Sequence, residues 1–286
     1  MCRLFGMSAG HEPARATFWL LEAPDSLSLQ SHREPDGTGL GWFDARDAPH
    51  VSKQPIAAYS DADFGREARE VSSRTFLAHI RFASTGELLL RNTHPFEQKR
   101  RLFAHNGVVE DLPTLEAHLG PDLSLVKGDT DSERLFALIT REIAAAGEVD
   151  AGIEAACRWV AENLPLYAIN LVLTAADELW ALRYPATHPL YVLEREPGSA
   201  LEHSSSLGAR VRCAEGSSRP FVVVASERLD ADPGWGELRP GELLHVDGSL
   251  QLRRRTILDG PPAHPLGLEQ LGERARASQA HGAPRP

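Results

Sequence analysis

The amino-acid sequence predicts an α+β protein in which mixed β-sheets carry helices on their outer faces. Three observations lead to this fold class. Strand-forming segments dominate residues 2–105, two helical segments follow within 130–163, and strand-forming segments return from residue 166 onward. Because sheets and helices each bury one apolar face, this order favours sheets that are covered by helices.

The first strands are expected close to the N-terminus. Cys2–Ser8 is short, apolar and rich in strand-forming residues, which indicates a buried strand. Residues 13–21 are compatible with a helix, because Pro13 is tolerated in a first helical turn. Residues 35–37, Pro-Asp-Gly, are a strong turn signal, and the strand expected after them is Thr38–Asp44.

Two further strands are expected before the helices. Thr75–Ser84 alternates, with apolar side chains on one face and Arg81 on the other. Leu102–His105 is expected to be a strand, and Asn106-Gly107 is expected to be the tight turn that follows it.

The periodicity then changes to that of helices. Thr130–Ala146 is predicted to be a helix, with Thr130 as its N-cap and Glu133 as the capping-box partner. Ala151–Asn163 is predicted to be a second helix. The strands expected after it are 168–174, 179–183, 190–193, 220–225 and 242–246, with a hairpin turn at 247–248 into 250–253.

One domain is expected over residues 2–255. Within it, residues 197–219 are dense in Ser and Gly and are expected to form a loop. Residues 256–286 are rich in Pro, Gly, Ala and Arg and have no sustained periodicity. We therefore expect a loosely ordered C-terminal tail.

Bulk composition narrows the class of protein. The 286 residues carry a formal charge of −10, which argues against general nucleic-acid binding. The three cysteines, Cys2, Cys157 and Cys213, make no disulfide framework and suit a reducing compartment. No apolar stretch is long enough to span a membrane, and residues 1–24 lack the plan of a signal peptide. A cytoplasmic protein is expected.

Cys2 is the first candidate for chemistry. Its small side chain permits removal of Met1, which would leave a thiol and a free α-amine on one residue. Their ordinary pKa values, about 8.5 and about 7.7–8.0, are close enough for the amine to accept the thiol proton near neutral pH. An N-terminal amine is an established activator of a nucleophile. The alternative is that Cys2 is simply a small buried hydrophobic residue.

Arg81 is the second candidate, because a charged residue at the end of an apolar strand requires a partner. Its planar guanidinium suits a substrate carboxylate, bound through two parallel hydrogen bonds. A structural pair with an Asp or a Glu is equally compatible with the sequence. Ser84 and Thr85 follow in the chain and are expected either to hydrogen-bond a ligand or to end the strand.

The remaining candidates are Asn106, Gly107 and Asp131. The side-chain amide of Asn106 and the backbone N–H of Gly107 could together polarise a carbonyl oxygen, whereas an ordinary Asn-Gly turn is the alternative. Asp131 lies in the first turn of the predicted helix. It could hold a substrate ammonium, or it could serve the cap and the helix dipole as first-turn acidic residues usually do.

Taken together, these residues resemble the class II (N-terminal-nucleophile) glutamine amidotransferase family. The opening Cys2–Ala9 and the stretch Gly128–Glu133 are most similar to the stand-alone YafJ-type branch and to the ergothioneine-pathway amidohydrolase that removes a γ-glutamyl group. The stretches that carry the resemblance, within residues 2–255, are 2–6, 35–41, 79–86, 92–96, 105–107 and 129–133.

The resemblance implies a four-layer αββα sandwich, the N-terminal-nucleophile hydrolase fold. It implies that Cys2 is the nucleophile and that Asn106 and Gly107 form the oxyanion hole. It also implies that Arg81 binds the α-carboxylate of the substrate and that Asp131 binds its α-amine. Ser84 and Thr85 fall in the glutamine pocket, and better-known members carry Trp and His where this chain has Phe82 and Thr85.

The expected activity is hydrolysis of the γ-amide of glutamine, or of a γ-glutamyl compound, through a γ-glutamyl thioester. No cofactor and no metal are expected. Nothing after residue 255 resembles an ammonia-consuming domain, so the chain is expected to hydrolyse a small molecule itself or to deliver ammonia to a separate protein. The alternatives are a zinc hydrolase that uses His79, His94 and His105, and a non-catalytic subunit that senses glutamine.

Overall fold

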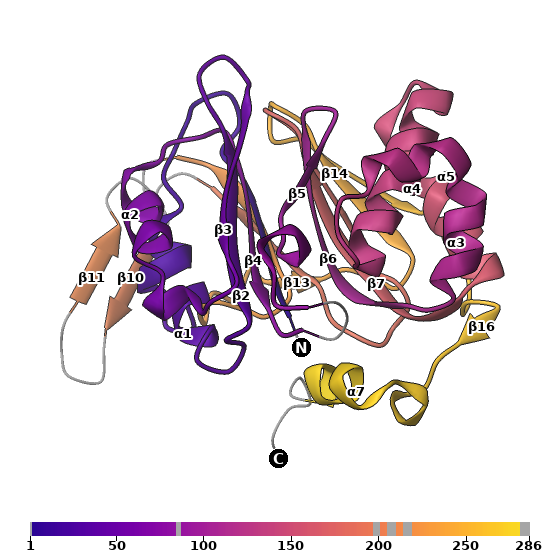
Figure 1. The fold of residues 1–286 in the computed structure, drawn as a ribbon. Helices are drawn as coiled ribbons and strands as arrows, with labels where there is room; N and C mark the ends of the chain where they lie inside the picture. The colour runs from indigo at the N-terminus through magenta and orange to yellow at the C-terminus, as the bar shows by residue number, and fades with distance from the viewer. Residues whose placement is uncertain (1, 84–86, 197–200, 205–209, 214–218, 281–286) are drawn as a thin grey trace.

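Two β-sheets lie face to face with helices on both outer sides, which gives four layers (Figure 1). The computed structural model describes residues 2–83, 87–196, 201–204, 210–213 and 219–280. The α+β class and the αββα arrangement expected from the sequence are therefore confirmed.

The first sheet has the N-terminal strand at its centre. Its order is β13 (Gly236–Glu237), β9 (Tyr191–Arg195), β12 (Phe221–Ala225), β1 (Arg3–Ser8), β4 (Thr75–Arg81), β2 (Gly37–Phe43) and β3 (Pro49–Gln54). All of these neighbours pair in an antiparallel manner.

The second sheet is antiparallel except for one short strand. Its order is β15 (Leu252–Thr256), β14 (Glu242–Val246), β8 (Leu179–Leu182), β7 (Pro165–Thr174), β6 (Arg101–Val109) and β5 (Phe96–Gln98), and β16 (His264–Pro265) adds a parallel pairing to β7. A separate hairpin pairs β10 (Leu201–Ser204) with β11 (Arg210–Cys213).

Helices cover the outer face of each sheet. Those beside the first sheet are η1 (Phe18–Glu22), α1 (Leu27–Gln30), η2 (Ala58–Ser60) and α2 (Ala62–Glu70). Those beside the second sheet are α3 (Leu112–Leu119), η4 (Gly120–Leu125), α4 (Asp131–Ala146) and α5 (Val149–Asn163). The short helix η3 (Leu90–Asn92) precedes β5, and η5 (Leu268–Gln270) and α7 (Glu273–Ala280) end the described chain. No helix among the described residues is long and apolar enough to cross a membrane.

Successive side chains of a strand point to opposite faces of its sheet, which divides the core into layers. In β1, Leu4 packs between the two sheets, whereas Phe5 packs outward under the helices that cover the first sheet. The sheets approach closely at Gly6, where a side-chain Cβ would lie 2.8 Å from Val172 Cγ1 of the facing sheet. Such packing anchors β1, which carries Cys2 at its start, against both sheets.

Several local expectations were wrong. Asn106-Gly107 is not a turn, because both residues lie inside β6, opposite Asn170 and Ile169 of β7. Only Phe18–Glu22 of the expected first helix is helical. The segment expected to be a loop contains the paired strands β10 and β11.

The segment after residue 255 contributes to the packing. Leu271, which follows η5, and Ala275 of α7 are buried in one apolar cluster with Val108, Tyr167 and Ala168 of the second sheet. The sequence shows little periodicity there because only a few side chains of the segment are buried. The residues against which those side chains pack are distant in the chain.

Candidate active site

Cys2 lies where β1 begins, beside the end of β4. The register that pairs Arg3 with Ile80 brings Cys2 next to the last residues of that strand. The backbone N–H of Phe82 donates to Cys2 Sγ, and the thiol in turn contacts Phe82 O, both at 3.3 Å. Burial raises the pKa of the Cys2 thiol, and the hydrogen bond from Phe82 opposes that shift.

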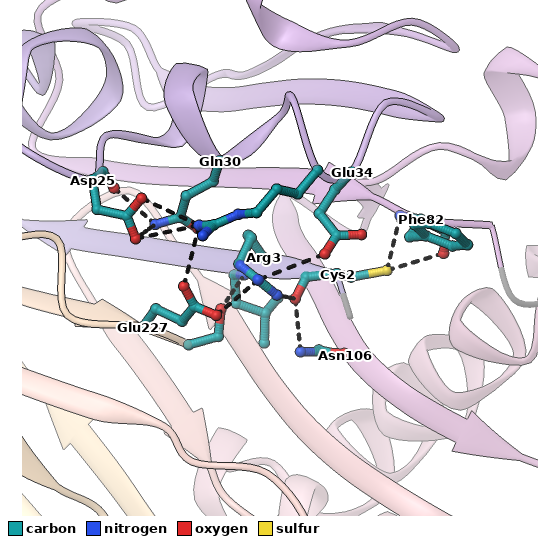
Figure 2. Close-up of polar contacts among 11 residues, drawn as sticks. Cys2, Arg3, Asp25, Gln30, Glu34, Phe82, Asn106 and Glu227 are labelled. Atoms are coloured by element: carbon teal, nitrogen blue, oxygen red, sulfur yellow. Dashed lines mark hydrogen bonds and ion pairs between the residues drawn. The ribbon is translucent and has the colours of Figure 1, made fainter. Parts of the chain in front are cut away.

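Asn106 reaches the same point from the second sheet. Its side chain is fully buried, and Nδ2 donates a hydrogen bond of 2.9 Å to the carbonyl oxygen of Cys2. Figure 2 shows this amide directed at the carbonyl oxygen of Cys2, which the guanidinium of Arg3 also approaches. A carboxamide nitrogen has two N–H donors, so one remains for a further acceptor.

Gly107 occupies a position where only glycine fits. A Cβ there would lie 1.9 Å from the carbonyl oxygen of Ala168 in β7 and 2.7 Å from His105 Nε2. The absent side chain leaves the backbone of β6 open to a cavity of about 20 Å³ beside Cys2. A cavity of this size holds about one water molecule, so a bound amino acid must displace part of its lining.

The same cavity is lined by Arg81, Phe82 and Asp131. The structure therefore brings Cys2, Gly107 and these three sequence-predicted residues together, although they come from distant parts of the chain. Asn106 touches the Cys2 carbonyl next to them. Ser84 and Thr85 lie outside the described residues.

Arg81 ends β4 with its side chain buried. Its Nη1 donates to the carbonyl oxygen of Glu87 at 3.1 Å. Burial lowers the pKa of Arg81, while the nearby Cys2, Asp36 and Asp131 act in the opposite direction. The guanidinium thus lies in a desolvated position where a substrate carboxylate would be attracted strongly.

Asp131 is held at the start of α4. The Oγ of Thr130 accepts a hydrogen bond from Glu133 N at 3.2 Å, which confirms Thr130 as the N-cap. The carboxylate of Glu133 accepts from Gly128 N at 2.6 Å, rather than from the N-cap residue as a capping box requires. Asp131 Oδ2 accepts from Val109 N at 3.0 Å, which fixes the carboxylate against the end of β6.

Arg3 was not identified from the sequence, although an arginine inside an otherwise apolar strand is a visible signal. Its side chain is buried and forms an ion pair of 2.7 Å with Glu227 and a longer one of 3.6 Å with Glu34 (Figure 2). Nη1 also lies 3.5 Å from the carbonyl oxygen of Cys2. The residue after the candidate nucleophile therefore contacts the backbone carbonyl of that nucleophile.

Three histidines lie near the cavity. His94 and His105 line it, and the ring of His79 is tilted by 37° from that of His94, with 4.2 Å between the two centroids. Burial, and secondarily the charge of Arg81, lowers the pKa of His79 to about 3, so its imidazole is neutral. Within the described ranges, no three His, Cys, Asp or Glu side chains are grouped to hold a metal ion.

The chain is similar to known proteins over most of its length. The family description "Glutamine amidotransferases class-II" matches residues 1–260. The gamma-glutamyl-hercynylcysteine sulfoxide hydrolase of Mycobacterium tuberculosis is 29% identical over 257 residues, which cover 86% of this chain and 93% of that protein. The putative glutamine amidotransferase YafJ of Escherichia coli is 24% identical and covers 85% of this chain and 96% of its own.

A solved structure supports the fold. The glutamine phosphoribosylpyrophosphate amidotransferase from B. subtilis superposes with a TM-score of 0.63 at 20% identity. The match covers 91% of this chain and 50% of that one, so the present chain spans about half of the larger enzyme. At this identity the likeness speaks for the fold alone.

Proposed function

The chain belongs to the class II glutamine amidotransferases, and from that membership we propose that it is an N-terminal cysteine amidohydrolase. Its relatives are enzymes that act on C–N bonds other than peptide bonds, and its activity is hydrolysis of a glutamine or γ-glutamyl amide. The proposal concerns the mechanism: Cys2 attacks the γ-carbonyl and forms a γ-glutamyl thioester.

The first step requires Met1 to be removed, so that the α-amine of Cys2 is free. That amine accepts the thiol proton while Sγ forms a bond to the γ-carbon. The negative charge on the carbonyl oxygen is stabilised by the second N–H of the Asn106 amide and by the backbone N–H of Gly107. The C–N bond then breaks, and the α-ammonium of Cys2 returns the proton to the leaving amine.

The second step releases the product. Water attacks the thioester carbon, and the α-amine of Cys2 takes a proton from the water. The C–S bond then breaks, which releases glutamate and regenerates the thiol. Throughout both steps Arg81 binds the α-carboxylate and Asp131 binds the α-ammonium of the glutamyl group. Phe82 contributes to the wall of the substrate pocket, and the glutamine-pocket role of Ser84 and Thr85 stays a prediction from the resemblance.

One observation carries this proposal. Cys2, Gly107, Arg81 and Asp131 line a single cavity, and Asn106 bonds to the Cys2 carbonyl beside it. The nucleophile and the oxyanion site suit the γ-amide of a glutamyl compound. The cation and the anion suit its α-carboxylate and its α-ammonium.

The proposal extends to the leaving amine and to the compartment of the reaction. The mycobacterial relative, named for a γ-glutamyl compound, favours a leaving amine larger than ammonia. Delivery of ammonia to a separate synthase and a purely glutamine-sensing role are the alternatives. We place the reaction in the cytoplasm, because a thiol nucleophile is preserved in a reducing compartment.

The test is to treat the purified protein with an electrophilic glutamine analogue and to map the adduct by peptide mass spectrometry. We expect the adduct on an N-terminal peptide that begins at Cys2. A chain that begins at Cys2 and stays unlabelled would contradict glutamine-like recognition. A Cys2→Ala protein that retains full turnover of a γ-glutamyl anilide would contradict the nucleophile.

A further inference from the structure

A second and larger cavity lies where the edges of the two sheets meet. Its volume is about 370 Å³, and its walls include Val51 and Lys53 of β3 and Phe96 and Glu97 of β5. β3 is the last strand of the first sheet and β5 the last strand of the second, and Figure 1 shows these two edges facing each other. None of the residues assigned above to catalysis lines this cavity.

Lysine is concentrated at this cavity. Only three of the 30 basic Lys and Arg residues of the chain are lysines: Lys53, Lys99 and Lys127. Two of them, Lys53 and Lys127, line the cavity, while Lys99 is exposed on the turn between β5 and β6. The other 27 basic residues are arginines.

Lys53 extends from β3 toward the chain that precedes β5. Its Nζ donates to the carbonyl oxygens of Thr93 at 2.6 Å and of Pro95 at 3.1 Å, and it lies 4.9 Å from the centroid of the Phe96 ring. An ammonium has three donors, so one is left after these two bonds. Burial, followed by the charge of Lys127, lowers the pKa of Lys53 to about 8, and Glu133 opposes the shift.

The other charged groups of the cavity have bonding partners of their own. Arg91 pairs with Asp129 at 3.2 Å. Glu133 accepts from Gly128 N, and Glu97 accepts from Arg100 N at 3.1 Å. Among the described residues, neither Lys53 nor Lys127 has a carboxylate oxygen within 4.0 Å.

Lys53 keeps one N–H donor, and the exposed ammonium of Lys127 lines the same cavity, so an anion bound there would accept charge-assisted hydrogen bonds from both. We propose that this cavity binds a small organic anion whose carboxylate or phosphate group lies between Lys53 and Lys127. The apolar part of the ligand packs against Leu90, Pro95 and Phe96, which line the same space.

The site shares a wall with the cavity beside Cys2. His94 lines that smaller cavity, whereas Pro95 and Phe96 line the larger one. Lys53 donates to the backbone carbonyls on both sides of His94. An anion that binds Lys53 would therefore change the hydrogen bonds that hold the shared wall. The anion is either a separate ligand or the leaving half of a larger γ-glutamyl substrate. In either case the group that binds the lysines is a carboxylate or a phosphate.

Titration calorimetry with phenyl phosphate at pH 7 tests the site, with uncharged phenol as the comparison. We expect saturable binding of phenyl phosphate, weakened about tenfold or more by Lys127→Met because a charge-assisted hydrogen bond is lost. Lys53→Met should weaken binding similarly, and Lys99→Met should leave it unchanged. Lys127 is exposed, so its variant folds and decides the result even if Lys53→Met does not.

The pH dependence provides a second readout. A bound anion favours the charged form of Lys53, so affinity should fall as pH rises from 7 to 9 through the pKa of about 8. Absence of saturable binding at millimolar phenyl phosphate would overturn the proposal. Equal affinity of the unsubstituted protein and Lys127→Met would overturn it as well.

A final arm separates the two sources of the anion. Phenyl phosphate should competitively inhibit hydrolysis of a γ-glutamyl anilide whose leaving aniline carries a carboxylate if the cavity receives the leaving half of the substrate. The KM of that substrate should be unchanged by phenyl phosphate if the ligand is separate. Since phenyl phosphate binding is measured without turnover, failure of this site and failure of the proposed mechanism remain distinguishable.

Discussion

The side-chain amide of Asn106 donates a 2.9 Å hydrogen bond to the backbone carbonyl of Cys2, and it thereby joins the two sheets at the candidate nucleophile. Asn106 belongs to β6 of the second sheet, and Cys2 precedes β1 of the first. The same amide is the proposed oxyanion donor, so one side chain both positions the nucleophile and stabilises the charge that its attack creates.

Asn106→Ala should therefore lower kcat by about 10²–10³-fold, the usual cost of one oxyanion donor. The measurement is steady-state hydrolysis of a γ-glutamyl anilide. Asn170→Ala is the matched control, because Asn170 lies opposite Asn106 in β7 and is equally buried. In the described part of the chain, its side chain bonds to backbone groups of 184, 188 and 189 and not to Cys2. A loss of kcat as large in Asn170→Ala would show that general destabilisation explains the effect.

Gly107→Ala should destabilise the fold and abolish turnover together. The new Cβ would lie 1.9 Å from Ala168 O, so β6 and β7 must move apart where the oxyanion donors lie. Overpacking of this kind costs about 1–3 kcal/mol or more. Urea denaturation measures that cost, and Gly272→Ala, where no atom lies within 4 Å of the new Cβ, should change the free energy of unfolding little. Normal activity in Gly107→Ala would rule out the close approach.

Arg3→Met should lower the free energy of unfolding by about 3–5 kcal/mol, because it leaves the buried Glu34 without the charge of Arg3. Thermal and urea denaturation provide the measurement. Arg33→Met is the control: Arg33 also reaches Glu227, at 3.6 Å, but it is half exposed, and such pairs contribute about 0–1 kcal/mol. Equal losses in the two variants would contradict the distinction between the buried pair and the exposed one.

Acid should destabilise the protein in part through His79. Its pKa is about 3 in the folded protein and about 6.5 when unfolded, so the unfolded state binds more protons between these values. Stability is therefore fully present above pH 6.5 and falls by up to about 1.4 kcal/mol per pH unit below it. Urea denaturation at pH 7, 6 and 5 measures the slope. His79→Gln should have a smaller slope, and an unchanged slope would exclude His79 as a source.

Much of the fold could be predicted because its signals are local. β1, β4 and α4 were found from apolar alternation, helical periodicity and the cap at Thr130. The strand β3, which has no buried residue, and the π-helix η1 carry weaker local patterns and were missed or misplaced. Asn106-Gly107 was misread for the opposite reason: the pair strongly favours a turn locally, but pairing with β7 keeps it extended.

The sequence by itself determined which chemical groups are present: a cysteine next to a removable methionine, an arginine ending an apolar strand, an amide beside a glycine and an acidic first helical turn. It also determined the α+β class, because periodicity is a property of neighbouring residues. Only the tertiary structure decided that these groups meet in or beside one cavity, that Arg3 contacts the carbonyl of Cys2, and that two of three lysines line a second cavity. The physical reason is that pairing register and sheet-on-sheet packing join residues far apart in the chain, and no local pattern encodes those distances.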